Sequence, residues 1–263
     1  MISSGTAAGE RLETFNSSWK LPPEELVLRN DEVHLWLVSI NSGDVYGLEN
    51  IISNDELARA ARFRLSQHRT EYVASRIHLR TILGKYTGIS PQLLGFEYNE
   101  YGKPSIADET TGNLKFNFSH SSGFALYAIT RSSEIGVDLE LINSSNIDGE
   151  MAAKLLTNSE LKRFNSLNSA ARAEFFYKCW TCKEAYSKAV GKGLIINPAK
   201  IETIYSAVES VCKLETDKVF QKTSNWTFFD LPPITGYVAG AVVEGINKTK
   251  LKCLRIPERK RMC

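Results

Sequence analysis

Three carboxylates and two lysines are concentrated in two short segments of this sequence. Asp138 and Glu140 lie in the first segment, and Lys183, Glu184 and Lys188 lie in the second. Oxygen-only ligands suit Mg²⁺ or Mn²⁺, which commonly bind through one or two carboxylates together with waters and substrate phosphates. A lysine one helical turn from such a glutamate can contact a phosphate oxygen as a charge or as a proton donor. The two segments therefore predict a site that holds a divalent cation against a phosphate.

A β-strand is expected to carry the first pair of carboxylates. Residues 134–142 alternate, with Ile, Val and Leu at one parity and the acidic residues at the other. Side chains two residues apart share a face of a strand, so Asp138 and Glu140 point the same way. An alternative stays open at this point, because an acidic pair on the exposed face of an edge strand is usually just solvated.

A long helix is expected to carry the second group. Apolar residues recur at spacings of three and four over residues 170–190, and Gly191 follows as a C-cap signal. Glu184 and Lys188 are four residues apart and share one face of this helix, whereas Lys183 points about a quarter-turn away. The alternative is an ordinary helix-surface ion pair between Glu184 and Lys188.

Composition and targeting signals narrow the class of protein. The formal net charge is +2, which gives no general attraction to nucleic acid. The five cysteines do not form a disulfide pattern, and Cys179 and Cys182 within the long helix are expected to be core thiols. The first residues lack the basic and apolar regions of a signal peptide, and no apolar run is long enough to span a membrane. We therefore expect a cytoplasmic protein that binds neither membranes nor nucleic acid.

The order of the predicted elements suggests a duplicated α+β unit. After a polar lead-in at residues 1–30, the first half is expected to contain a strand, two helices and further strands, at residues 32–40, a helix opening at Ser53, 67–86, 96–98, 115–118 and 124–130. The second half repeats this outline at residues 135–142, 158–164, 170–190, 201–205, 211–216, 225–230 and 237–243. Residues 251–263 are expected to be a basic, solvated tail. Within the helix at 67–86, Arg80 is expected to pack and to form surface pairs across helices, and the role of Arg76 stays open.

Four short motifs, taken in their order along the chain, indicate a resemblance to a known family. They are Gly102-Lys103-Pro104, Phe116-Asn117-Phe118-Ser119-His120-Ser121, Gly136-Val137-Asp138-Leu139-Glu140 and Trp180-x-x-Lys183-Glu184-Ala185-x-x-Lys188. The chain resembles the 4′-phosphopantetheinyl transferases, and its length and two-part layout resemble the Sfp (surfactin synthetase-activating) type. The resemblance implies an α+β pseudodimer of two similar α/β subdomains, at residues 31–131 and 132–250, with the active site in the cleft between them.

The resemblance also assigns roles to individual residues. Asp138, Glu140 and Glu184 are implied to bind Mg²⁺, with Mn²⁺ possible, and Asp138, Glu184 and Lys188 to be catalytic. Coenzyme A is implied to be the substrate. Its phosphates would be held by residues from several segments, namely Arg59, Gly102, Lys103, Asn117, Ser119, His120 and Lys188.

The implied reaction is transfer of the 4′-phosphopantetheine arm of coenzyme A to a serine of an acyl or peptidyl carrier protein, with release of adenosine 3′,5′-bisphosphate. Such an enzyme would act in fatty-acid, polyketide or nonribosomal peptide synthesis, and the pseudodimer implies a monomer. Two alternatives remain. A metal-dependent phosphodiesterase or nuclease could use the same carboxylates and lysine, but it would need a basic face for nucleic acid. A non-catalytic module that binds coenzyme A or carrier proteins would be expected to lack a metal carboxylate or Lys188.

Overall fold

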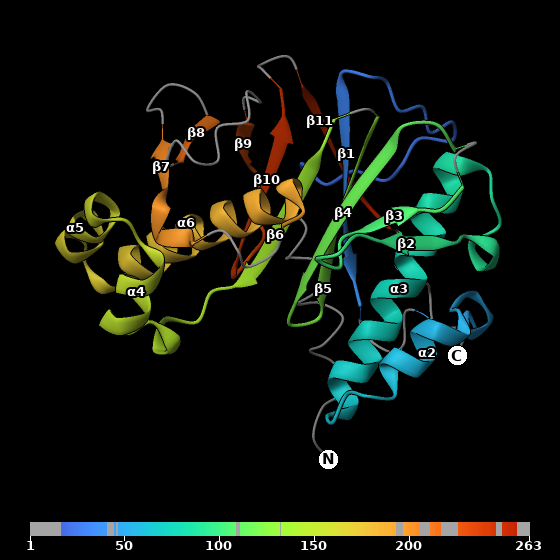
Figure 1. The fold of residues 1–263 in the computed structure, drawn as a ribbon, viewed down its shortest axis with the longest axis horizontal. Helices are drawn as coiled ribbons and strands as arrows, with labels where there is room; N and C mark the ends of the chain where they lie inside the picture. The colour runs from blue at the N-terminus through green and yellow to red at the C-terminus, as the bar shows by residue number, and fades with distance from the viewer. Residues whose placement is uncertain are drawn as a thin grey trace.

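The computed structural model describes residues 17–40, 45, 47–108, 111–131, 133–192, 197–205, 211–216, 226–245 and 249–256. Two similar halves, each a sheet with a long helix, lie side by side in Figure 1. The first half contains β1 (Glu32–Ser39), α2 (Asn54–Ala60), α3 (Ser66–Thr87), β2 (Phe96–Tyr98), β3 (Pro104–Ile106), β4 (Leu114–Ser121) and β5 (Phe124–Arg131). The second contains β6 (Ile135–Leu141), α4 (Gly149–Leu155), α5 (Asn158–Ser166), α6 (Ser169–Val190), β7 (Ile201–Tyr205), β8 (Val211–Thr216), β9 (Trp226–Asp230) and β10 (Tyr237–Glu244). The predicted α+β pseudodimer is confirmed.

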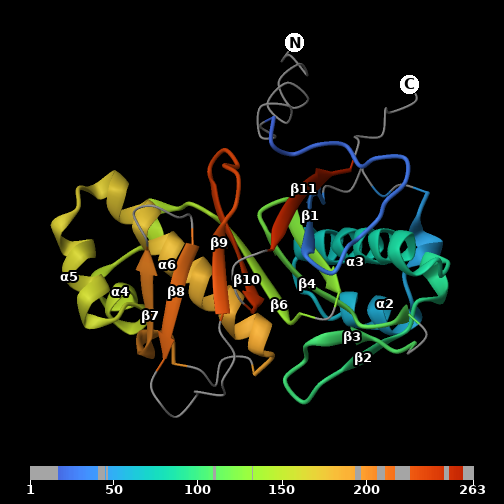
Figure 2. The same cartoon turned by 90° about the horizontal axis from the view of Figure 1, so that it is seen from above.

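The sheets and long helices form four layers. The first sheet has the strand order β11-β1-β5-β4, where β11 is Lys250–Arg255, and the second has the order β6-β10-β9-β8-β7. Helix α3 covers the outer face of the first sheet and α6 covers the outer face of the second, with the sheets between them (Figures 1 and 2). The inner faces of the two sheets bury one shared apolar core, which includes Leu35 and Leu126 from the first sheet and Val137 and Leu139 from the second.

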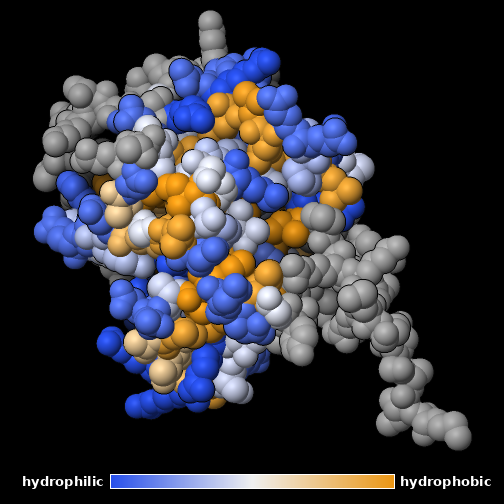
Figure 3. Space-filling model, turned by 90° about the vertical axis from the view of Figure 1, so that its right-hand side faces the viewer, coloured by the Kyte–Doolittle hydropathy of each residue, from blue (hydrophilic) through white to orange (hydrophobic). Residues whose placement is uncertain are grey.

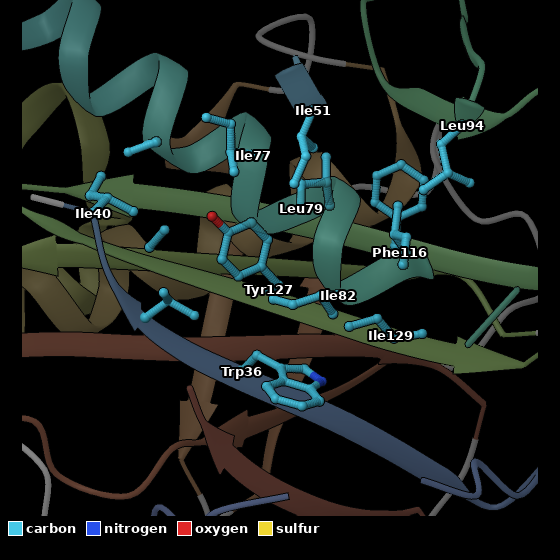
Figure 4. Packing of buried hydrophobic residues seen from close by; sticks show 14 of the residues in the cluster. Trp36, Ile40, Ile51, Ile77, Leu79, Ile82, Leu94, Phe116, Tyr127 and Ile129 are labelled. Atoms are coloured by element: carbon cyan, nitrogen blue, oxygen red, sulfur yellow. The ribbon is translucent and has the colours of Figure 1, made fainter. Parts of the chain in front are cut away.

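The core of the first half lies between α3 and its sheet. Ile77 and Ile82 of α3 point onto Trp36, Tyr127 and Ile129 of β1 and β5 (Figure 4). All five side chains are fully buried. Burial of large apolar side chains is the main favourable term in folding, so this cluster fixes α3 on the sheet.

The core of the second half brings α6 unusually close to β6. A Cβ atom added to Gly136 would lie 1.9 Å from the carbonyl oxygen of Ala185 and 2.4 Å from the backbone nitrogen of Ala189. No larger residue fits this contact, because both obstructing groups are backbone atoms. Gly136 therefore sets the short distance between the strand and the helix that carry the predicted site.

Both halves contain the same combination of a helix cap and a buried ion pair, which supports the internal duplication. A short helix in each half begins with a capping box, Ser53 with Glu56 in α2 and Thr157 with Glu160 in α5. Each capping glutamate is also buried against a cation on the long helix of its half. Glu56 accepts hydrogen bonds from Arg76 and Arg80 of α3, and Glu160 accepts one from Lys183 of α6. Arg80 pairs across helices as predicted, but the pair is buried and not at the surface, and Arg76 shares it.

The predicted lead-in and tail need correction where the structure describes them. Residues 250–255 form strand β11, which pairs in parallel with β1, so the basic tail expected from residue 251 is in part an ordered sheet strand. Lys20 bonds β11 through its backbone, at 3.0 Å to Cys253 and 2.8 Å from Arg255. The lead-in is also packed, since Trp19 is only 2% exposed. Residues 1–16 and 257–263 lie outside the described residues.

Among the described residues, none of the helices combines the length and the apolar character that crossing a bilayer requires. Seen from the side of the first half, hydrophobic areas alternate with hydrophilic ones (Figure 3).

Replacing Gly136 by alanine should destabilise the protein severely. The new methyl group would force β6 and α6 apart, and overpacking of this kind against backbone costs about 3 kcal/mol or more. The free energy of unfolding from urea denaturation measures the effect. Gly149→Ala is the matched control, because a Cβ atom there meets nothing within 4 Å. Equal stabilities of the two variants would refute the close-contact interpretation.

Candidate active site

The two halves meet where polar side chains of β4 reach the free edge of β6. Alternate residues of β4 point to this edge, while Phe116 and Phe118 point to α3. Asn117 Oδ1 accepts a hydrogen bond from the backbone N–H of Val137 at 3.0 Å, and Ser121 Oγ accepts one from Leu141 at 3.2 Å. Unpaired N–H groups at a buried strand edge are costly, so these side chains replace a missing neighbouring strand. We call this contact the β4–β6 junction.

A buried carboxylate lies at the centre of the β4–β6 junction. Asp138 is 2% exposed, and its Oδ1 accepts hydrogen bonds from Lys188 Nζ at 2.6 Å and from Ser119 Oγ at 2.8 Å. Lys188 Nζ also donates to Ser119 Oγ at 2.9 Å. The three groups come from β6, α6 and β4, so the tertiary fold assembles them. Asp138 Oδ2 is buried and has no hydrogen-bond partner among the described residues.

The other two predicted carboxylates, one on β6 and one on α6, lie near enough to Asp138 to feel its charge. Glu140 accepts hydrogen bonds from Trp180 Nε1 and Ser121 Oγ, both at 3.3 Å. Trp180, Glu184 and Lys188 are spaced by four residues and form one stripe on α6 that faces β6. The solvated-pair alternative for Asp138 is thus wrong, since its carboxylate is buried at the junction.

The carboxylates strongly influence one another's protonation. Burial and then repulsion from Asp138 raise the pKa of Glu140 from its usual 4.5 to about 7. The same two causes raise the pKa of Glu184, although Lys188 lowers it in part. Desolvation of the His120 ring by the protein atoms around it, and then the charge of Lys188, lower the pKa of that ring, although the residue as a whole is exposed. The site therefore holds more negative charge than its protein partners neutralise.

A hard divalent cation fits this donor set. All three side chains offer oxygen ligands, and Asp138 Oδ2 is a buried acceptor that receives no donor from the residues the structure describes. In the part of the chain that the structure describes, no three His, Cys, Asp or Glu side chains form a ready-made metal site. Mg²⁺ usually needs only one or two carboxylates and completes its shell with waters and phosphate oxygens. Asp138, Glu140 and Glu184 are therefore the residues that could hold it.

Lys103, the predicted lysine of the Gly-Lys-Pro turn, forms hydrogen bonds to residues of the second half. Gly102 adopts a left-handed φ of 85° in the turn between β2 and β3. Lys103 Nζ donates to Glu134 Oε2 at 2.6 Å and to the carbonyl oxygen of Ala189 at 2.7 Å. A pocket of about 220 Å³ opens beside it, lined from both halves by Asn99, Lys103, Pro104, Ser105, Leu114, Lys115, Phe116, Glu134, Val190 and Gly191.

The remaining predicted coenzyme A contacts differ in their burial and in their interaction partners. Asn117 is 5% exposed and its amide oxygen is used by Val137. His120 is exposed at the end of β4, next to Ser119. Arg59 is exposed in the last turn of α2, where its guanidinium carbon lies 5.8 Å from the centre of the Tyr72 ring. Their roles toward coenzyme A stay predictions.

The site also contains the side chains of Trp180 and Ser121, neither of which was predicted to act there. Trp180 and Ser121 both bind Glu140 and fix its position. The four-residue spacing from Trp180 to Glu184 was a usable signal, because it puts both side chains on the same helix face. Ser121 shares the parity of Asn117 and Ser119 on β4, which also indicated a common face.

Removal of the Asn117 side chain should weaken the junction between the halves. Asn117→Ala leaves the buried N–H of Val137 without an acceptor, at a cost of about 1–3 kcal/mol in unfolding free energy. Chemical denaturation measures this loss. The exposed residue Asn113 provides the control, and an Asn113→Ala variant as destabilised as Asn117→Ala would contradict the account.

The stability of the metal-free protein should fall as the pH rises through neutrality. The folded protein binds the Glu140 proton more tightly than the unfolded chain, so this stabilisation is complete below about pH 4.5 and is lost as the pH rises through about 7. Glu140→Gln lacks this loss and should be more stable than the wild type at pH 8, by roughly 1 kcal/mol. Thermal unfolding in EDTA from pH 5 to pH 8 tests this. Glu150→Gln, at a residue whose side chain is 77% exposed, should keep the wild-type slope, and a wild-type slope in Glu140→Gln would be the contrary result.

Comparisons with known proteins agree with this arrangement. The family described as the 4′-phosphopantetheinyl transferase superfamily matches residues 134–242, and 4′-phosphopantetheinyl transferase, N-terminal, matches residues 42–132. The 4′-phosphopantetheinyl transferase HetI of Nostoc sp. is 36% identical over 235 residues, covering 88% of this chain and 95% of the relative.

Two more distant relatives carry related names. The 4′-phosphopantetheinyl transferase Sfp of Bacillus subtilis is 26% identical over 145 residues, which is 55% of this chain and 62% of the relative. The L-aminoadipate-semialdehyde dehydrogenase-phosphopantetheinyl transferase of Xenopus laevis is 26% identical over 197 residues, with coverages of 68% and 64%. The predicted family is confirmed, and the Sfp type stays a prediction. By these matches the chain belongs to the 4′-phosphopantetheinyl transferase superfamily.

Proposed function

We propose that this protein transfers the 4′-phosphopantetheine arm of coenzyme A to a serine hydroxyl of an acyl or peptidyl carrier protein. The observation that carries the proposal is the Asp138–Lys188–Ser119 cluster at the junction of the halves. There a lysine meets a carboxylate with one oxygen that has no hydrogen-bond partner within the described part of the chain. The group of Asp138, Glu140 and Glu184 beside Lys188 suits a metal-bound pyrophosphate better than a free anion, because the uncompensated carboxylates would repel the phosphates. The family membership supports the same reaction.

The substrate would be held by residues from both halves. Lys188, whose side chain is 30% exposed, can turn one of its three N–H donors to a pyrophosphate oxygen. Ser119 and His120 at the end of β4 would contact further phosphates, as would Arg59. The pyrophosphate charge would be partly neutralised by Mg²⁺ held on Asp138, Glu140 and Glu184.

The reaction exchanges one phosphorus–oxygen bond for another. The carrier serine oxygen bonds to the phosphorus that bears the pantetheine arm, and the bond from that phosphorus to the bridging oxygen breaks. Adenosine 3′,5′-bisphosphate leaves with the bridging oxygen, and Lys188 stabilises the charge that builds there. The serine proton passes to a carboxylate, for which Glu184 is our first choice because its pKa is raised toward the working pH.

The proposal includes the partners and setting expected from the sequence. Carrier protein domains and coenzyme A are the partners, and the enzyme is proposed to act as a cytoplasmic monomer of the Sfp type. A nuclease is disfavoured by the family membership and the small net charge. A binding module without activity is disfavoured because Asp138, Glu140, Glu184 and Lys188 are all present.

The transfer should be visible as a mass change of a carrier protein. Incubation of several purified apo carrier proteins with the enzyme, coenzyme A and Mg²⁺ should add one phosphopantetheine arm, detected by intact-mass spectrometry. Glu184→Gln and Lys188→Ala should each slow the transfer by about 100-fold or more, since they remove the proposed base and the charge stabilisation. EDTA should abolish it.

The control variant changes a lysine outside the cluster. Lys192 is exposed just beyond the end of α6, so Lys192→Ala should keep the wild-type rate. No mass gain on any carrier, with coenzyme A still bound, would favour the binding module over the transferase.

A further inference from the structure

The C-terminal end of α6 is capped by a turn from the other half of the molecule. The last carbonyl groups of a helix have no partners within the helix. At the end of α6 the amide Nδ2 of Asn99 donates to the carbonyl oxygen of Gly191 at 2.8 Å, and Lys103 Nζ donates to that of Ala189 at 2.7 Å. Both donors come from the turn between β2 and β3, so this turn lies against the helix end.

The turn is rigid enough to act as a cap. Asn99 Oδ1 accepts hydrogen bonds from the backbone N–H groups of Tyr101 at 3.0 Å and Lys103 at 2.8 Å. The backbone of Asn99 is bonded to Gly102 and Lys103 at 3.0 Å and 3.1 Å. One side chain therefore orders the turn with its oxygen and contacts α6 with its nitrogen.

The fit between the turn and α6 is close. Gly191 has a left-handed φ of 71°, and a Cβ atom there would lie 2.9 Å from Lys103 Cδ and 3.2 Å from Asn99 Nδ2. Lys103 also places its positive charge at the negative end of the helix dipole, where cations are stabilising. Its ammonium group is balanced by Glu134 at 2.6 Å.

The capped turn is the turn that carries Lys188. Lys188 directly precedes Ala189, the residue whose carbonyl oxygen Lys103 binds. Its Nζ must lie within 2.6 Å of Asp138 and 2.9 Å of Ser119 at the same time. Fraying of this last turn would let Lys188 move away from both, and a displacement of about 1 Å at a reacting centre can cost a large part of the rate.

We propose that Lys103 is a positioning residue that holds the last turn of α6, and so Lys188, in place, rather than mainly a contact for a coenzyme A phosphate. This inference rests on the proposed transfer reaction. It assigns to the Gly-Lys-Pro turn a role between the two halves, with Asn99 as its second anchor.

The chain offers a matched control in Lys115. Its Nζ pairs with the same carboxylate, Glu134, at 3.1 Å. However, Lys115 lies on β4 and, among the residues that the structure describes, pairs with Glu134 alone, whereas Lys103 also bonds α6. Lys103→Met and Lys115→Met each remove one charge beside Glu134 and keep the aliphatic stem.

Two measurements on the full-length protein test the proposal. In steady-state transfer assays with coenzyme A varied, Lys103→Met should lower kcat by about tenfold and leave KM for coenzyme A within about threefold of the wild type. Hydrogen exchange read by mass spectrometry should be faster in a peptide that covers the last turn of α6. Lys115→Met should leave kcat and the exchange unchanged. Lys103→Gln is a second variant, and its smaller loss of kcat is expected because it keeps an N–H donor.

Two results would overturn the proposal. One is a large rise in KM for coenzyme A with unchanged kcat in Lys103→Met, which would make Lys103 a substrate contact. The other is wild-type exchange in the last turn of α6. Absence of transfer by the wild-type protein would instead refute the proposed function, and the exchange experiment would still decide whether Lys103 holds the helix.

Discussion

The structure depends on how β6 is completed at its free edge. β6 pairs with β10 on one side, and on the other side the side chains of Asn117 and Ser121 take the place of a neighbouring strand. This polar contact joins the two halves and brings Ser119 onto Asp138. The close approach of α6 at Gly136 then sets Lys188 against the same carboxylate. The contacts that join the two halves are therefore also the contacts that form the site.

The two halves differ in what lies between the long helix and the first strand of each. Both long helices have 22 residues and end at a left-handed glycine. In the first half the space between α3 and β1 is filled by a hydrogen-bonded aromatic group, in which the Tyr86 hydroxyl lies 2.8 Å from both Trp36 Nε1 and His34 Nδ1. In this group the three polar side chains bond one another, while the second half keeps crowded carboxylates with raised pKa values. Functional sites often retain such unfavourable charges.

Local patterns predicted the elements of the site but not its long-range contacts. Periodicity found β6 and α6 and put Asp138 and Glu140 on one face, because strand and helix geometry fix neighbours within a few residues. Strand β11 was missed because its partner β1 lies at the other end of the chain. The cap formed by Lys103 on α6 was missed for the same reason, since no periodicity relates a turn to a distant helix end.

The most direct test of the account is the effect of Mg²⁺ on coenzyme A affinity, measured by calorimetry. The account predicts that Mg²⁺ tightens binding by about tenfold or more in the wild type, because it neutralises charge between Asp138 and the pyrophosphate. Asp138→Asn should lose most of this gain and remain folded. An equal Mg²⁺ effect in both proteins, or binding of coenzyme A that is indifferent to Mg²⁺, would contradict the claim that the β4–β6 junction is the pyrophosphate site.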